Sequence, residues 1–255
     1  MKARIYALLE VIFIAMFIFS AYKLVTIYVD YSKGDEIYEE SEDSYFEVPQ
    51  NNTDKDKDFK LDIDKLQKTN KDALGWIYIE DTPVSYPLLQ TDNNQYYLKR
   101  TYNNVHSAFG SIFIDYRSSA DLNDKNTLIY GHNTKNGSMF GSLKKYKKEE
   151  YLRNHPYIYI VYKDKTYKYQ IFTAFTALTS NRVYTLDFES AADFRDWIRY
   201  VHSQSEVKVP DIKPTGKEKI ITLSTCTSRR DDERFVVLAV QVDVMDNGNS
   251  IELGK

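Results

Sequence analysis

The order of apolar and polar residues divides the chain into three parts. Residues 5–22 are almost all apolar, with Glu10 as the one charged residue, and apolar residues resume at 24–29. Residues 30–58 are rich in Asp, Glu, Lys, Asn and Ser. From residue 59 onwards, short apolar runs alternate with polar turns, which is typical of a folded domain. The pattern predicts an apolar helix, a polar connecting segment and one globular domain.

The apolar segment 5–29 has the length of a membrane span, because an apolar helix of about 20 residues crosses the hydrocarbon core of a bilayer. Lys2 and Arg4 precede it, which favours a cytoplasmic end at residues 1–4 and an extracytoplasmic domain. The alternative is a cleaved signal peptide, but no clean small-x-small cleavage site follows the apolar run. We therefore expect a single-pass anchor in the cell membrane.

The connecting segment, residues 30–58, contains few large apolar side chains and charges of both signs. Such a composition does not bury enough apolar surface to offset the entropy lost on folding. We therefore expect a flexible extracytoplasmic tether between the anchor and a domain at residues 59–255.

Most of the globular part consists of β-type runs rich in Tyr, Ile, Val, Phe and Thr. The expected strands are residues 76–79, 83–87, 110–114, 126–130, 157–162, 166–178, 219–223 and 235–244. Helices do not alternate with them as they would around a parallel sheet. The pattern favours a mainly β fold, a closed or nearly closed barrel.

A few helices are expected around this barrel. Asp62 is placed to cap a short helix, residues 93–98 predict a helical turn, and residues 138–146 predict a further helix. Residues 187–204 form the clearest amphipathic pattern in the domain. Its apolar positions follow i, i+3, i+4, i+7 spacing at Phe194, Trp197, Ile198 and Val201.

Composition narrows the possible chemistry. The formal net charge of -3 argues against a nucleic-acid partner. A single cysteine excludes an internal disulfide, so folding depends on the core alone. The chain has no CxxC or HExxH motif and no His/Cys cluster, so we expect no metal site and no cofactor.

Three reactive side chains lie at the ends of predicted strands. Cys226 ends the run Thr-Leu-Ser-Thr-Cys, His132 follows the run 127–131, and Arg234 opens the last strand. A thiolate is a nucleophile, an imidazole transfers protons near neutral pH, and a guanidinium stabilises an oxyanion. The general alternative is that a lone cysteine is a small buried apolar residue.

The other candidates fit these roles less well. His106, His155 and His202 lie in a polar loop, in a turn before a proline and on the predicted long helix, so none follows a buried strand. Arg229 and Arg230 belong to a charged loop between the last two strands and stay alternatives to Arg234.

Thr222-Leu-Ser-Thr-Cys226 with a strand-opening arginine, and Leu128-Ile-Tyr-Gly-His-Asn133 upstream, resemble the sequence elements of sortases. The Tyr-Gly-His-Asn form resembles class B sortases in particular, and the resemblance covers about residues 61–244. It implies an eight-stranded barrel with N-terminal helices and a long helix between the sixth and seventh strands. It also implies that Tyr130, Ser224, Asn94 and Leu98 line the groove for the substrate peptide.

The resemblance further implies a membrane-anchored cysteine transpeptidase of Gram-positive bacteria. Such an enzyme cleaves a C-terminal x-Pro-x-Thr-(Gly/Asn) sorting signal after Thr through a thioester on Cys226, with His132 as acid and base. The implied partners are exported proteins that carry the signal, and a peptidoglycan precursor amine. Two alternatives stay open: an extracytoplasmic cysteine peptidase without transpeptidation, and a membrane-tethered binding module with an inert thiol.

Overall fold

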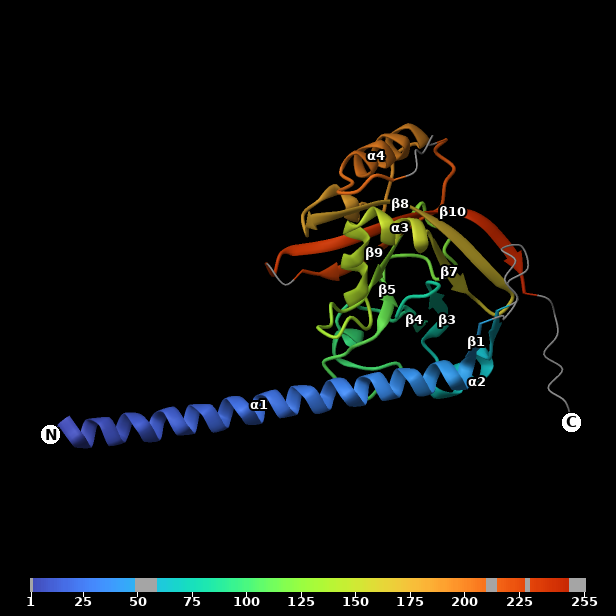
Figure 1. Cartoon of the computed structure of the whole chain (residues 1–255). Coiled ribbons are helices and arrows are strands. Elements are labelled where there is room, and N and C mark those ends of the chain that lie inside the picture. Colours follow the sequence, from blue (N-terminus) through green and yellow to red (C-terminus); the bar gives the residue numbers. More distant parts are fainter. Residues whose placement is uncertain (1, 49–58, 210–214, 228–229, 248–255) are drawn as a thin grey trace, which may run out of the picture.

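The computed structural model of the chain describes residues 2–48, 59–209, 215–227 and 230–247. Eight strands close into a barrel in the order β10-β8-β7-β3-β4-β5-β6-β9 (Figure 1). They are β3 (Ala73–Tyr78), β4 (Ser85–Leu89), β5 (Ile112–Ile114), β6 (Asn126–Tyr130), β7 (Tyr157–Val161), β8 (Lys165–Leu178), β9 (Ile220–Cys226) and β10 (Glu233–Asp246). The β4–β5 and β6–β9 pairs are parallel and the others antiparallel. The predicted closed barrel is confirmed.

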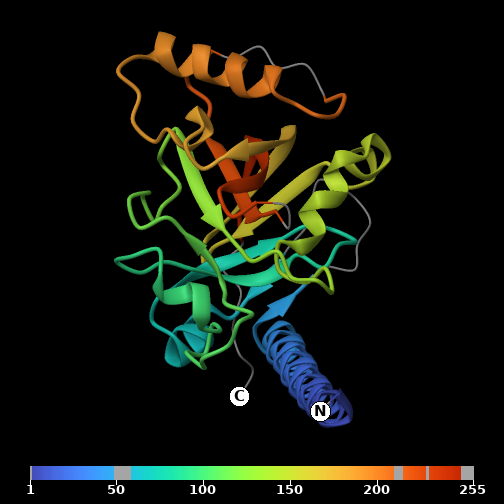
Figure 2. The ribbon, with the colours of Figure 1, turned by 90° about the vertical axis from the view of Figure 1, so that its left-hand side faces the viewer.

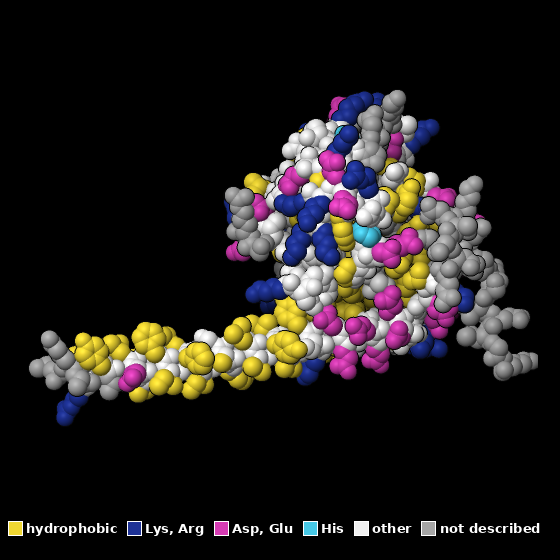
Figure 3. Space-filling model, in the orientation of Figure 1, with side chains coloured by type: hydrophobic (Ala, Val, Ile, Leu, Met, Phe, Trp, Pro, Cys, Tyr) yellow, Lys and Arg dark blue, Asp and Glu magenta, His cyan; other side chains and the backbone are white. Residues whose placement is uncertain are grey.

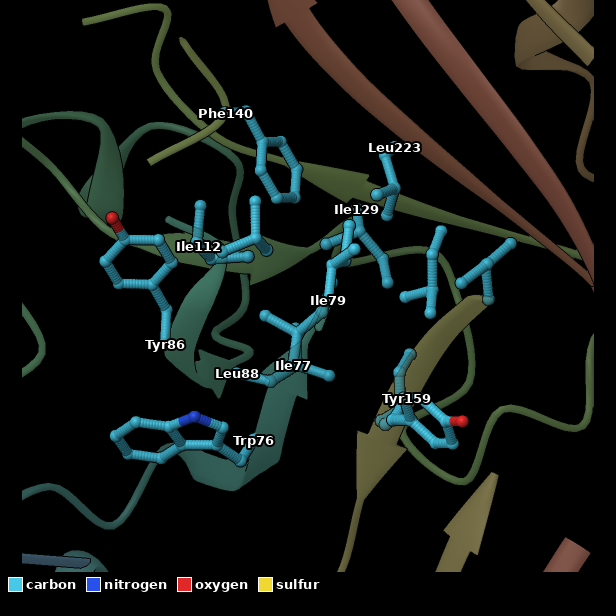
Figure 4. Packing of buried hydrophobic residues seen from close by; sticks show 14 of the residues in the cluster. Trp76, Ile77, Ile79, Tyr86, Leu88, Ile112, Ile129, Phe140, Tyr159 and Leu223 are labelled. Carbon is cyan, nitrogen blue, oxygen red and sulfur yellow. The ribbon is translucent and has the colours of Figure 1, made fainter. Parts of the chain in front are cut away.

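The core lies on both sides of the barrel wall. Along β10, Val237 and Ala239 belong to the larger cluster, which fills the barrel and extends to α1 and β1, whereas Val236 and Leu238 belong to a second, outer cluster. This division follows from the alternation of side chains along a strand. Both faces of β10 are therefore apolar over residues 235–240, where its sequence reads as a continuous apolar run. Figure 4 shows part of the larger cluster, including Trp76, Ile129 and Leu223.

The outer cluster lies under α4 (Ala191–Ser203), which buries Phe194, Trp197, Ile198 and Val201. The Ser190 hydroxyl accepts a hydrogen bond from the Asp193 amide and caps the helix. Because α4 lies between β8 and β9, it joins the sixth and seventh barrel strands, as predicted.

The remaining elements are short. Asp62 caps α2 (Ile63–Thr69) as predicted, and the predicted turn and helix at 93–98 and 138–146 appear as the 3-10 helices η1 (Tyr96–Lys99) and η2 (Gly141–Lys147). The prediction did not include α3, η3 or the β1–β2 pair, which are too short to leave a periodic signal. Their bounds are α3 Glu149–Asn154, η3 Arg182–Tyr184, β1 Phe46–Glu47 and β2 Lys60–Leu61.

The helix α1 (Lys2–Tyr45) runs beneath the barrel and extends beyond it (Figures 1 and 2). By length and composition it is apolar enough to cross a membrane. In Figure 3, hydrophobic side chains cover its N-terminal part and acidic side chains gather where it passes the barrel.

The expected flexible tether at 30–58 is wrong for residues 30–48. Residues 30–45 continue α1, and β1 follows. One face of this helical part packs on the domain through Tyr31, Gly34, Tyr38, Ser41 and Tyr45, while Glu36, Glu39, Glu40 and Asp43 are exposed. The packed positions are three or four residues apart, which places them on one helix face. Residues 49–58 lie outside the described residues.

Candidate active site

A cavity of about 440 Å³ opens at the rim of the barrel. All seven residues that the sequence singled out line it. The complete lining is Asn94, Leu98, Phe113, Arg117, Tyr130, Gly131, His132, Thr179, Tyr184, Ser224, Thr225, Cys226 and Arg234. These residues come from β5, β6, β9, β10, η1, η3 and adjoining loops, so the fold gathers segments that are far apart in the sequence.

The antiparallel register of β9 and β10 places Cys226 directly opposite Arg234. Side chains of directly opposed residues start about 5 Å apart. The Cys226 thiol is exposed and forms no disulfide. Arg230 does not line the cavity, and its guanidinium pairs with Asp232 at 2.7 Å. Arg229 lies outside the described residues.

The parallel pairing of β6 and β9 brings His132 to the same rim. Tyr130, the last residue of β6, is the register partner of Ser224, and two residues further along each chain segment lie His132 and Cys226. Parallel strands end at the same edge of a sheet, so equal offsets from a paired position reach the same level. The two-residue steps from Tyr130 to His132 and from Ser224 to Cys226 therefore bring the imidazole and the thiol to the same rim of the barrel.

The imidazole of His132 is half-buried and held by backbone groups. Its Nε2 lies 2.6 Å from the carbonyl oxygen of Leu98. Because a carbonyl oxygen only accepts hydrogen bonds, this contact requires the proton on Nε2. Nδ1 is then the ring nitrogen left for proton exchange in the cavity.

The guanidinium of Arg234 lies at the end of β10. One of its terminal nitrogens, NH1, donates to the carbonyl oxygens of Asp231 at 2.6 Å and Glu233 at 3.0 Å. These bonds fix the guanidinium against the backbone of the loop that precedes Arg234. Since a guanidinium carries five N–H donors, others remain for a ligand in the cavity.

A buried carboxylate organises another wall of the cavity. Asp115, which is 0% exposed, accepts hydrogen bonds from the side chains of Arg117, Tyr130 and Asn94. Burial alone would raise the pKa of Asp115, but these bonds outweigh it and hold the pKa below its ordinary value. The ionised carboxylate thus fixes three side chains that line the cavity.

Sequence reasoning missed Asp115 and Arg117. The available signal was the same one that marks His132, because Asp115 directly follows the buried strand β5. It also missed Tyr184, from η3, whose hydroxyl lies 3.1 Å from the Ser224 Oγ. Burial raises the pKa of Tyr184, and the positive charge of Arg234 opposes that rise.

No group of three or more His, Cys, Asp or Glu side chains within the described ranges is placed to hold a metal ion.

Comparison with known proteins identifies the family. A profile of the sortase domain matches residues 77–242. The chain belongs to the class B sortases. It is 43% identical to the sortase B of Listeria monocytogenes over 169 residues, which cover 66% of this chain and 68% of that relative. Sortases are cysteine transpeptidases, and this class B sortase is therefore an enzyme of that type.

Solved structures of class B sortases have the same fold. The sortase B of Bacillus anthracis superposes with a TM-score of 0.72 at 31% identity, covering 85% of this chain and 100% of that one. A Staphylococcus aureus sortase B–substrate complex gives a TM-score of 0.66 at 32% identity, covering 71% of this chain and 84% of that one.

Proposed function

We propose that this sortase cleaves exported proteins after Thr within a C-terminal x-Pro-x-Thr-(Gly/Asn) signal and joins them to a peptidoglycan amine. The observation that supports the proposal is the meeting of Cys226, Arg234 and His132 in one cavity. Cys226 and Arg234 face each other across β9 and β10, and His132 reaches the same rim from β6.

In the first half of the reaction, the Cys226 thiolate attacks the Thr carbonyl carbon. Negative charge develops on the carbonyl oxygen, where the Arg234 guanidinium donates to it. The C–N bond then breaks, and imidazolium His132 gives its proton to the leaving amine. The product is a thioester between Cys226 and the Thr carbonyl.

In the second half, the peptidoglycan amine attacks the thioester carbon and His132 accepts the proton it loses. The C–S bond breaks, the thiolate of Cys226 is restored and an amide bond forms. Membership in the sortases supports this transfer over the two alternatives, simple peptide hydrolysis and a binding module with an inert thiol.

The peptide lies, in this proposal, along the cavity wall made by Asn94, Leu98, Tyr130 and Ser224. These four residues line the cavity together with Cys226. The existence of a Staphylococcus aureus sortase B–substrate complex supports substrate binding by this fold.

The proposal also includes a membrane anchor. Residues 5–29 of α1 cross the cell membrane, residues 1–4 lie in the cytoplasm, and the catalytic domain at 59–255 lies outside. Lys2 and Arg4 favour this orientation. Since Cys226 is the single cysteine, a membrane-impermeant maleimide applied to intact cells tests it. Labelling of Cys226 is expected, and labelling only after lysis would contradict the orientation.

The catalytic assignment is tested by cleavage and transfer of a fluorogenic sorting peptide with and without an added amine. Cys226→Ala and His132→Ala are each expected to lose more than about 99% of activity, because removing a nucleophile or its base costs several orders of magnitude. His106→Ala, at an exposed position outside the cavity, is the matched control and is expected to keep full activity. Equal losses at His106 and His132 would refute the assignment of the base.

A further inference from the structure

The part of α1 beside the barrel contacts the loops that surround His132. Tyr31 and Tyr38 pack against Phe109, with ring centroids 5.7 and 5.9 Å apart. Gly34 approaches the same ring so closely that a Cβ there would lie 2.5 Å from it. The helix is therefore seated directly on the turn at residues 107–111.

Tyr38 makes the closest polar contact in this interface. Its hydroxyl donates to the Gly110 carbonyl oxygen at 2.6 Å and lies 3.0 Å from the Ser111 Oγ. The ring is 4% exposed and packs against Tyr86 as well as Phe109, with the Tyr86 centroid 5.2 Å away. A ring confined in this way holds the hydroxyl, and with it the Gly110 carbonyl, in one place.

Gly110 in turn forms one wall around His132. Its φ of +62° lies in the left-handed region that favours glycine. A Cβ at this position would lie 2.6 Å from the His132 Cδ2 and 2.9 Å from Nε2. The imidazole thus rests against the Gly110 backbone on one side and is bonded to the Leu98 carbonyl by Nε2.

A second contact reaches the loop that follows His132. The carboxylate of Asp35 accepts hydrogen bonds from the Asn136 side-chain amide at 2.8 Å and from the Ser138 hydroxyl at 2.8 Å. The same loop returns to His132 through the bond from the Phe140 amide to the His132 carbonyl oxygen, at 3.0 Å. One face of α1 therefore holds the segments on two sides of the imidazole.

We propose that Tyr38 is a positioning residue for His132, so that the helix leading out of the apolar segment is part of the active-site scaffold. The hydroxyl of Tyr38 fixes the Gly110 turn, and the turn fixes the imidazole at the place where it exchanges protons with the thiol and the amine. This inference rests on the proposed role of His132 as acid and base.

The test uses the full chain in detergent micelles and the variant Tyr38→Phe. This change keeps the ring and its packing but leaves the buried Gly110 carbonyl without its donor. Tyr45→Phe is the matched control, because it also removes a tyrosine hydroxyl from α1. The Tyr45 hydroxyl bonds to Thr69 in α2, at 2.9 Å, and Thr69 does not line the cavity. Asp35→Ala is the second variant, which keeps the test decisive should Tyr38→Phe fail to fold.

Two readouts are measured on the folded fraction. Tyr38→Phe is expected to lower kcat of peptide cleavage about 10-fold with little change in KM, since a displacement of about 1 Å costs up to about 100-fold. The pH dependence of Cys226 alkylation by iodoacetamide, which is specific because the chain has one thiol, is expected to move towards that of His132→Ala. Asp35→Ala is expected to change both readouts in the same direction, and Tyr45→Phe neither.

The outcomes separate this inference from the proposed function. Wild-type kcat and an unchanged alkylation profile in Tyr38→Phe would overturn the positioning role of Tyr38. If that variant does not fold, the same result in Asp35→Ala would overturn the claim that α1 is part of the active-site scaffold. If His132→Ala is inactive in the same experiments, the proposed function stands without it. Full activity of His132→Ala would overturn both, because no acid and base would then remain at this place.

Discussion

Asp115→Asn is the change that tests most sharply how the cavity is held together. Oδ1 accepts from the Arg117 backbone amide and from its Nε, both at 2.9 Å. Oδ2 accepts from Arg117 NH2 at 2.8 Å and from the Tyr130 hydroxyl and the Asn94 amide at 2.9 Å. An asparagine replaces one of these oxygens with an NH2 group, which then faces donors.

The expected loss of stability follows from these contacts. The amide orients so that its NH2 replaces Oδ1, where two donors rather than three lose their acceptor. A hydrogen bond to a charged group contributes about 1.5–3 kcal/mol, but the half-exposed Arg117 side chain recovers part of this from water. We expect a loss of about 2–3 kcal/mol in the free energy of unfolding.

The same change is expected to act on substrate binding. Arg117, Tyr130 and Asn94 all line the cavity, whereas Asp115 itself does not. We expect KM for a sorting peptide to rise roughly 10-fold, since about 1.4 kcal/mol of binding free energy is lost when these groups shift. The value of kcat is expected to change less, because neither Cys226 nor His132 bonds to this network.

The assay compares urea denaturation and peptide-cleavage kinetics of Asp115→Asn with those of Asp121→Asn. The control is the same substitution in the loop that follows, at an exposed carboxylate that bonds to Ser119 and Asn123. Equal urea midpoints and equal KM values for the two variants would show that the Asp115 network does not support the cavity.

The stability difference between wild type and Asp115→Asn is also expected to depend on pH. The folded state lowers the pKa of Asp115, so the stabilisation is fully present above the ordinary aspartate pKa of about 3.9. It is lost as the pH falls through the lower folded-state pKa. Urea midpoints are expected to differ at pH 7 and to converge towards pH 3; a constant difference would contradict the ionised assignment.

Three further outcomes are expected. Arg234→Lys is expected to lower kcat/KM about 100- to 1000-fold, because lysine keeps the charge but loses the planar guanidinium. Arg230→Ala removes only an exposed ion pair with Asp232 and is expected to stay near wild type in the same kinetics. Gly110→Ala is expected to lower kcat about 10- to 100-fold, since its Cβ would lie 2.6 Å from the His132 ring; unchanged kcat would argue against a fixed imidazole. A chain that begins at Asp30 is expected to be soluble and active, because Asp30 still bonds to Ser107 and Ala108. A chain that begins at Phe46 lacks the α1 residues that cover Phe109 and is expected to unfold at a lower urea concentration. Equal midpoints for the two shortened chains would show that the α1 interface adds no stability.

Much of the barrel was predictable because its strands leave local signals. Runs such as 126–130 and 166–178 are apolar and β-branched and end at polar residues, and the amphipathic spacing of Phe194, Trp197, Ile198 and Val201 marks α4. The residues of the candidate site were predictable for a related reason. Cys226, His132 and Arg234 each lie at a strand end, where a side chain reaches the barrel rim.

Only the tertiary structure decided how these ends meet. The parallel β6–β9 pair and the antiparallel β9–β10 pair fix which strand ends share an edge, and strand pairing depends on contacts between distant residues. The sequence marked Asp115 only by its place after β5. Its hydrogen bonds with Tyr130, Asn94 and Arg117 depend on the tertiary structure, because these partners come together only in the fold.

The segment 30–45 shows most directly what sequence composition alone does not predict. Its average composition is polar and predicts a tether, but its Tyr31, Tyr38 and Tyr45 side chains lie on one helix face. A single helix with such a narrow apolar face is marginal in water by itself. It becomes a fixed part of the protein because the barrel presents Phe109, Tyr86 and the Gly110 carbonyl to that face, and these partners exist only once the fold has formed.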